Sequence, residues 1–149
     1  MGRAELAEEV IVASVDPGVT SGVAVATFPY YPSDEPHAFE ADQVETLSYF
    51  ESLRTLNVLV CESFVPRPGA KTWQPASLEL IGALRWMAHK RGIPFVLQSP
   101  AAGKKFGTNE KLKKIGWYTV GGAGHINDAK RHLLLYAVTK NLIPIELFT

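Results

Sequence analysis

Three acidic residues stand where apolar segments of the sequence begin or end. Asp16 follows the apolar run 10–15, Glu62 closes the run 57–62, and Asp128 lies near the start of the last long apolar segment. Ligands of open α/β sheets bind at the carboxyl ends of the strands. Two carboxylates brought together there would raise each other's pKa unless a cation lay between them. The pattern therefore indicates a cation site at the edge of a sheet.

The residue types indicate which cation and which reaction. Carboxylate oxygens are the preferred ligands of hard divalent ions, above all Mg²⁺. Two such ions roughly 3.5–4 Å apart can activate a water and stabilise the leaving oxygen when a phosphodiester is cleaved. His125 precedes Asp128 by three residues, so it can lie on the same side of a helix start and reach the same ion or water. Asp16, Glu62, Asp128 and His125 are the candidate metal-binding and catalytic residues.

Each of these residues also has a plainer role when it is taken alone. Asp16 precedes Pro17 and Gly18 and suits a tight turn. Glu62 could form a salt bridge with Arg67. Asp128 could be only an acidic residue in the first turn of a helix, where the helix dipole favours it. The chemical interpretation depends on the fold bringing the acids together.

Apolar runs and helical periodicity predict the elements that must position these residues. Strands are expected over 10–15, 21–28, 37–43, 57–62 and 94–98, helices over 44–56, 77–91 and 126–140, and a helical turn over 109–114. The polar segment 99–107, with its two glycines, is expected to be a loop. A front hairpin followed by alternating helices and strands predicts a mixed α/β sheet with helices on its faces. A length of 149 residues suits one domain over 1–149.

The net charge is zero, because fifteen basic residues balance fifteen acidic ones. This balance argues against a nucleic-acid-binding domain, which is usually basic. The charge is unevenly spread, however: residues 1–65 hold two basic and eleven acidic residues, whereas residues 66–115 hold ten basic and two acidic ones. Such asymmetry is typical of a chain that presents one surface to a polyanion, although the same charges could also pair with one another on the folded surface.

Composition excludes several other classes. The single cysteine, Cys61, excludes an intramolecular disulfide framework and the usual cysteine-based zinc sites. No apolar run reaches the ~18–20 residues of a membrane span. The first nine residues carry three glutamates and lack the apolar stretch of a secretory signal. We therefore expect a cytoplasmic protein that does not engage a membrane.

Three motifs resemble the RuvC-type Holliday-junction resolvases of the RNase H-like superfamily. They are VDPGVTSGVAV, the Glu62-Ser63 pair that ends a later strand, and GHINDAKRHLLLYA at the last helix. The small size suggests a phage-type member, which would act in the host cytoplasm if it is phage-encoded. The resemblance implies an RNase H-like α/β fold: a mixed five-stranded sheet with antiparallel front strands and parallel later ones, flanked by helices. It further implies one or two Mg²⁺ or Mn²⁺ ions and a homodimer that makes paired nicks in four-way DNA junctions, in recombination, repair or phage DNA processing.

The resemblance can be carried over position by position. Asp16 resembles the family's first-strand metal ligand, Glu62 its fourth-strand acid and Asp128 its last-helix acid, while His125 falls where many members have another Asp and some have His. The helix over 77–91 resembles the element that pairs subunits, and the basic loop 103–114 is where junction phosphates are expected. The candidate DNA-binding residues are Arg67, Lys71, Lys104, Lys105, Lys111, Lys113 and Lys114.

Two other functions would use the same fold. A nuclease acting on forks, flaps or RNA–DNA hybrids would have the same site and differ only in the geometry of its substrate. A catalytically silent nucleic-acid-binding module would bind junctions without cutting them. The presence of all three acids favours an enzyme.

Overall fold

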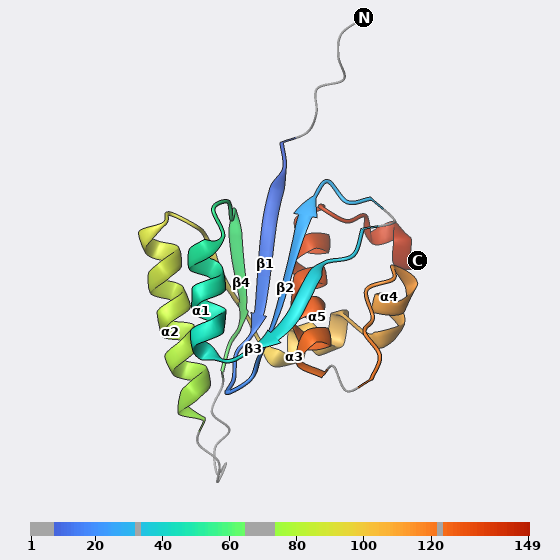
Figure 1. Cartoon of the computed structure of the whole chain (residues 1–149). Coiled ribbons are helices and arrows are strands. Elements are labelled where there is room, and N and C mark those ends of the chain that lie inside the picture. Colours follow the sequence, from blue (N-terminus) through green and yellow to red (C-terminus); the bar gives the residue numbers. More distant parts are fainter. Residues whose placement is uncertain (1–7, 32–33, 65–73, 122–123) are drawn as a thin grey trace, which may run out of the picture.

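A five-stranded sheet with helices on both faces forms the fold (Figure 1). The computed structural model describes residues 8–31, 34–64, 74–121 and 124–149, so the candidate DNA-binding residues Arg67 and Lys71 lie outside the described residues. The elements are β1 (Val10–Asp16), β2 (Ser21–Phe28), β3 (His37–Ala41), α1 (Gln43–Ser52), β4 (Val58–Glu62), α2 (Pro75–Lys90), β5 (Phe95–Gln98), α3 (Pro100–Phe106), α4 (Asn109–Lys114), α5 (Gly124–Thr139) and the 3₁₀ helix η1 (Ile145–Phe148).

The sheet is mixed, as predicted. Its strand order is β3-β2-β1-β4-β5. The first three strands pair antiparallel, whereas β4 runs parallel to both β1 and β5. Because Val15 pairs with Cys61 and Glu62 pairs with Gln98, the carboxyl ends of β1, β4 and β5 meet at one edge of the sheet.

The two faces of the sheet pack against different helices, with α1 and α2 on one face and α5, accompanied by α3 and α4, on the other (Figure 1). Successive strand residues point to opposite faces. Val12 of β1 and Val60 of β4 pack in the α5-side core, whereas their neighbours pack on the α1–α2 side. Asp16 and Glu62 follow Val12 and Val60 by an even number of residues. Both acids therefore emerge on the face that α5 covers.

The sequence expectations fail for one segment, 99–114, and miss the ends of two other elements. The predicted loop 99–107 is wrong, because residues 100–106 form α3: the Ser99 side chain accepts a hydrogen bond from the amide of Ala102, and Pro100 occupies the first turn. The basic loop expected over 103–114 is accordingly the end of α3 followed by α4. The helix predicted over 44–56 ends at Ser52, and the strand predicted to reach Gln43 ends at Ala41 because Asp42 caps α1.

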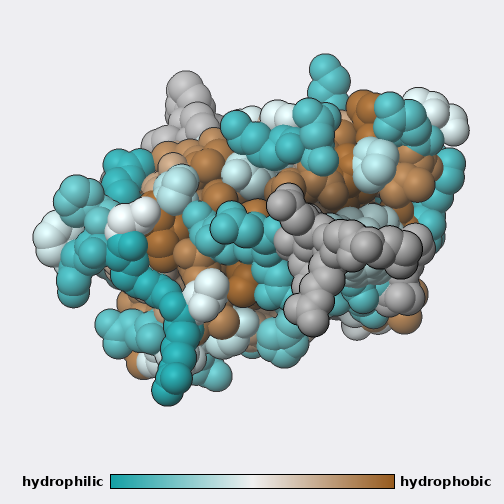
Figure 2. Space-filling view, turned by 90° about the horizontal axis from the view of Figure 1, so that it is seen from above, coloured by the Kyte–Doolittle hydropathy of each residue, from teal (hydrophilic) through white to brown (hydrophobic). Residues whose placement is uncertain are grey.

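The end of the molecule opposite the carboxyl ends of β1, β4 and β5 exposes both apolar and hydrophilic side chains. Figure 2 views the molecule from above, where β1 begins, and apolar atoms are exposed there between hydrophilic side chains. Among the helices of the described ranges, none combines the length and the hydropathy needed to cross a membrane.

The amino end of α5 lies directly on β2, at Gly22. A Cβ atom at Gly22 would overlap the backbone carbonyl of His125 and would lie 3.0 Å from the backbone nitrogen of Ile126. A glycine is therefore required where β2 passes under α5. This contact fixes how far α5 extends over the carboxyl edge of the sheet.

We expect Gly22→Ala to lower the free energy of unfolding by roughly 1–3 kcal/mol, because the α5 backbone must move to admit the methyl group. The measurement is urea denaturation followed by circular dichroism. The matched control is Gly82→Ala in the exposed part of α2, where a Cβ would meet nothing within 4 Å. Alanine should be stabilising there by up to about 1 kcal/mol. Equal stabilities for the two variants would contradict a close contact at Gly22.

Candidate active site

A cleft of about 580 Å³ opens at the carboxyl ends of β1 and β4. Asp16 and Glu62 line it from the two neighbouring strands, and His125 lines it from the first turn of α5. The turn after β1 and the start of α2 form other parts of its wall. The structure thus brings three of the four candidate residues, separated by up to 109 positions in sequence, to one cleft.

The turn after Asp16 is held by two buried hydroxyl groups. The Ser21 hydroxyl accepts a hydrogen bond from the Gly18 amide over 3.2 Å. The Ser77 hydroxyl donates one to the carbonyl of Pro17 over 3.0 Å, which ties the turn to α2. Ser21 is buried and bonded within the turn, so its hydroxyl stabilises the hairpin.

Asp16 and His125 are in direct contact. Nδ1 of His125 lies 3.2 Å from Oδ2 of Asp16. The Asp16 side chain is largely buried, whereas about half of the His125 side chain is exposed. The imidazole therefore lies at the mouth of the cleft with one nitrogen toward the carboxylate, where it can exchange protons with solvent.

The site raises the pKa of Asp16 from its ordinary value to about 7. Burial contributes most, because it removes the carboxylate from water, and repulsion from Glu62 comes next. The hydrogen bond from His125 lowers the pKa of Asp16, whereas the charge of Asp128 raises it further. A carboxylate under these conditions is stabilised by any cation placed near it.

Glu62 is held by a residue that the sequence interpretation missed. Nε2 of His132 lies 2.9 Å from Oε2 of Glu62, and Nδ1 of the same ring lies 2.8 Å from Oε1 of Gln98. His132 is only 2% exposed. Its position four residues after Asp128, on the same side of the helix, was the available sequence signal. The salt bridge suggested between Glu62 and Arg67 involves a residue outside the described part of the chain.

Asp128 does not line the cleft. Its Oδ1 accepts a hydrogen bond from Nε of Arg131 over 3.2 Å, and both side chains line a neighbouring depression of about 600 Å³. Arg131 also donates to the carbonyl of Gly107 and to the side chain of Asn109, which ties α5 to the start of α4. Asp128 is nevertheless near enough to raise the pKa of Asp16.

The donor set suits Mg²⁺ or Mn²⁺ in chemistry, since it consists of carboxylates with one imidazole. In the described ranges, however, no three His, Cys, Asp or Glu side chains converge on one point. Each acid faces a partner from α5 instead: Asp16 faces His125, Glu62 faces His132 and Asp128 faces Arg131.

The described candidate DNA-binding lysines all belong to α3 and α4. Lys104, Lys105, Lys113 and Lys114 are exposed. Lys111 is partly covered, and its ammonium lies 3.9 Å from the centre of the Phe106 ring. The Lys113 ammonium lies 4.7 Å from the centre of the Tyr118 ring. Lys104 also lines the depression that contains Asp128, which places part of this basic surface beside the candidate site.

Known structures share this architecture. The Thermus thermophilus RuvC structure matches with a TM-score of 0.66 and 15% sequence identity, covering 89% of this chain and 96% of that chain. T. thermophilus RuvC in complex with a Holliday junction substrate matches at a TM-score of 0.62 with the same identity and coverage. The fowlpox virus Holliday junction resolvase matches at 0.55 and 13% identity, covering 88% of this chain and 99% of that chain.

No protein-family model matches the chain, and no curated protein matches its sequence. The structural likeness, together with the mixed sheet, establishes that the chain has a RuvC-like fold, as the motifs predicted. The likeness extends over nearly the whole of both chains.

We expect Asp16→Asn to raise the melting temperature of the protein in EDTA above pH 7. The folded protein keeps a proton on Asp16 that the unfolded chain releases above its ordinary pKa of 3.8, so wild-type stability falls as pH rises from about 4 to about 7. Asparagine carries no such charge. The gain should be several degrees, since each kcal/mol shifts Tm by roughly 2–4 °C at this size, and it should shrink toward zero near pH 4.

Differential scanning calorimetry at pH 4, 5.5 and 7.5 would measure this effect. Glu40→Gln, which removes an exposed carboxylate on the edge strand β3, is the control and should show no such pH-dependent gain. An Asp16→Asn protein that melts below wild type at pH 7.5 would contradict the electrostatic description of the cleft.

Proposed function

We propose that this RuvC-like chain is a metal-dependent endonuclease that resolves four-way DNA junctions by paired nicks. The observation that carries the proposal is the cleft in which Asp16, Glu62 and His125 meet at the carboxyl edge of this fold. The T. thermophilus relative of the same fold is seen with a Holliday junction, and the fowlpox virus relative is a Holliday junction resolvase. The proposal places the whole of 1–149 in one nuclease domain.

Asp16, Glu62 and Asp128, with His125, are the residues that would hold one or two Mg²⁺ or Mn²⁺ ions. Bound there, the ions would supply Lewis acidity for a water and charge stabilisation for the leaving oxygen of a phosphodiester. The raised pKa of Asp16 supports this assignment, because it reports a buried carboxylate with unfavourable negative neighbours.

The residues of the chain have separable roles in the proposed reaction. Asp16 is largely buried beside Glu62, so its carboxylate gains most from a bound cation. His125, half exposed and hydrogen-bonded to Asp16, orients the attacking water or completes the metal-binding set. Gly22 and the tied turn at Pro17 keep these two side chains in register. Arg131 holds Asp128 in place from the next turn of the helix.

The basic helices α3 and α4 would contact the DNA backbone beside the cleft. Lys104 shares a depression with Asp128, and Lys105, Lys113 and Lys114 extend the basic surface over exposed positions. Arg67 and Lys71 remain candidates for the same role from outside the described residues. Contacts of this kind bind phosphates without reading sequence, which suits selection by junction shape.

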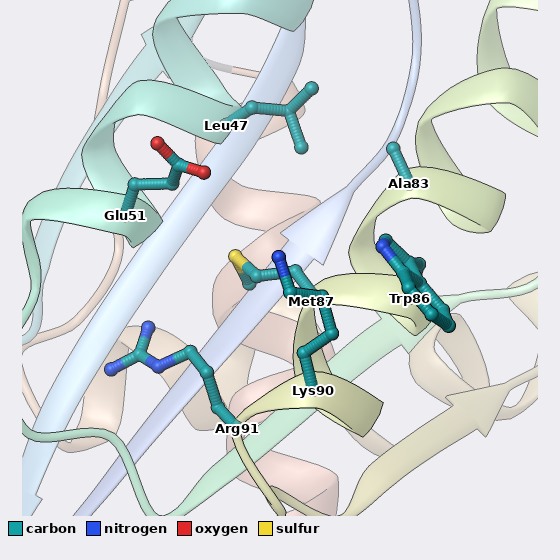
Figure 3. Close-up of a pocket in the computed structure, with 7 residues that line it drawn as sticks. All are labelled: Leu47, Glu51, Ala83, Trp86, Met87, Lys90 and Arg91. Carbon is teal, nitrogen blue, oxygen red and sulfur yellow. The ribbon is translucent and has the colours of Figure 1, made fainter.

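Two active sites are needed for two nicks, and we propose a homodimer that pairs through α2. A groove of about 400 Å³ runs between α1 and α2 and is shown in Figure 3. Leu47 and Glu51 line it from α1, and Met87 and Lys90 line it from α2. Trp86, on the rim of the groove, exposes 62% of its surface and stacks on His89. Exposed aromatic residues of this kind are typical anchors of protein interfaces.

We expect the purified protein with Mg²⁺ to nick a synthetic four-way junction at symmetric positions on two strands, as mapped on a denaturing gel. Asp16→Asn should abolish cleavage, with a loss of at least about 10³-fold, while leaving junction binding in gel shifts close to that of the wild type. Preferential cutting of a fork, flap or RNA–DNA hybrid in parallel assays would support the related nuclease activity instead. Binding without metal-dependent cutting would support a silent module, and wild-type cleavage by Asp16→Asn would overturn the site assignment.

Junction affinity should depend strongly on salt if α3 and α4 contact the backbone. The slope of log affinity against log salt should be about −0.9 for each phosphate neutralised, so Lys104→Gln combined with Lys105→Gln should make it less steep by up to about 2. Lys140→Gln, an exposed lysine beyond the far end of α5, should leave the slope unchanged. A double variant with the wild-type slope, measured by fluorescence anisotropy, would show that α3 does not meet the DNA.

A further inference from the structure

His132 is the residue of the site that neither the motifs nor the fold comparison assigns. It comes from the third turn of α5, one turn after Asp128, and its ring lies between the carboxyl ends of β4 and β5. Its two nitrogens contact Glu62 and Gln98, which are register partners on these strands. Both nitrogens of a side chain that is 2% exposed are therefore engaged at the edge of the cleft.

The direction of the hydrogen bond to Glu62 follows from the chemistry of the partners. A carboxylate only accepts hydrogen bonds, so Nε2 of His132 must carry the hydrogen in the 2.9 Å contact with Oε2. With Oε1 of Gln98 facing Nδ1, the second nitrogen donates as well. If the amide is turned over, Gln98 donates to Nδ1 instead. Either orientation leaves Nε2–H directed at Glu62.

The ring cannot tilt away from this position, because α3 packs against it. A Cβ atom at Gly103 would lie 2.5 Å from Cε1 of His132 and 2.8 Å from each ring nitrogen. Gly103 is buried, so the helix that was predicted as a loop forms a wall behind the imidazole. Gln98 holds Nδ1 of the ring, and Gly103 lets α3 approach the ring closely. The other nitrogen, Nε2, is thereby directed at Glu62.

We propose that His132 is a positioning residue that holds the Glu62 carboxylate by Oε2 and leaves Oε1 available to the cleft. Glu62 lines the cleft, and its side chain retains an exposed fraction of 18%. When a metal-ligating carboxylate is oriented by a hydrogen bond from a second residue, removal of that residue typically lowers the metal affinity of the site by about 10–100-fold. The consequence for metal binding rests on the function proposed above, whereas the contact itself does not.

The first test needs no metal. In protein labelled with ¹⁵N-histidine, we expect the Nε2–H proton of His132 to be visible by NMR and protected from exchange with water. Glu62→Ala, which removes the acceptor, should broaden or abolish this signal. A proton that exchanges equally fast in wild type and Glu62→Ala would overturn the proposed hydrogen bond.

The second test measures Mn²⁺ binding to the protein alone by isothermal titration calorimetry. His132→Phe keeps a ring but removes both nitrogens. Gly103→Ala displaces the ring without changing any proposed ligand. Each variant should lower the affinity for Mn²⁺ by about 10- to 100-fold. Gly82→Ala, another helical glycine, should bind as wild type does. His132→Gln, whose amide can still donate toward Glu62, should recover most of the affinity, a rescue that loss of packing alone would not permit.

The outcomes separate this inference from the proposed function. Wild-type Mn²⁺ affinity in both His132→Phe and Gly103→Ala, with thermal melts that confirm folding, overturns the positioning role. Metal binding that depends on Glu62 and His132 without any junction cleavage supports the positioning role and overturns the proposed function. Failure of the wild-type protein to bind Mn²⁺ overturns both.

Discussion

The close packing of the α5 amino end on β2 is the constraint on which the rest of the site depends. At Gly22 the two backbones approach so closely that no side chain fits between them. A helix rises about 1.5 Å per residue, so a shift of α5 by one residue would remove His125 from Asp16 and His132 from Glu62 together. The contact at Gly22 therefore helps to set the alignment of His125 and His132, which both come from α5, with Asp16 and Glu62.

The acids themselves are brought together by the alternation of the strands. Asp16 and Glu62 end neighbouring parallel strands and share a face with Val12 and Val60, so they follow the core outward to the same edge. This arrangement is unfavourable in itself, because it buries one carboxylate beside another and raises the pKa of Asp16. The chain offsets the repulsion with partners from α5, each matched to one acid. A divalent cation near Asp16 and Glu62 would offset the same repulsion, while His132 continues to hold Glu62 by Oε2.

The sequence predicted the sheet and its acids because both depend on local patterns. Apolar runs and a helical period are properties of short segments, and an acid at the end of such a run is visible in the sequence. Two glycines and two lysines in 99–107 are typical of a polar loop, whereas Ser99-Pro100 is a helix-start signal, and in the structure the helix α3 forms. Gly103 lies within the helix, where the absence of a side chain leaves room for the His132 ring. His132 is distant in sequence, so the local pattern around Gly103 does not reveal this role.

By itself, the sequence determined the types of the strands and of the long helices, the strand ends that carry Asp16 and Glu62, and the uneven charge, since each depends on neighbours along the chain. Only the tertiary structure decided that His125 meets Asp16, that His132 holds Glu62, and that Asp128 is paired with Arg131 beside the cleft and not within it. These pairings depend on where a helix is placed over a sheet. That placement is fixed by backbone contact between segments about a hundred residues apart, and it leaves no periodic trace in the sequence.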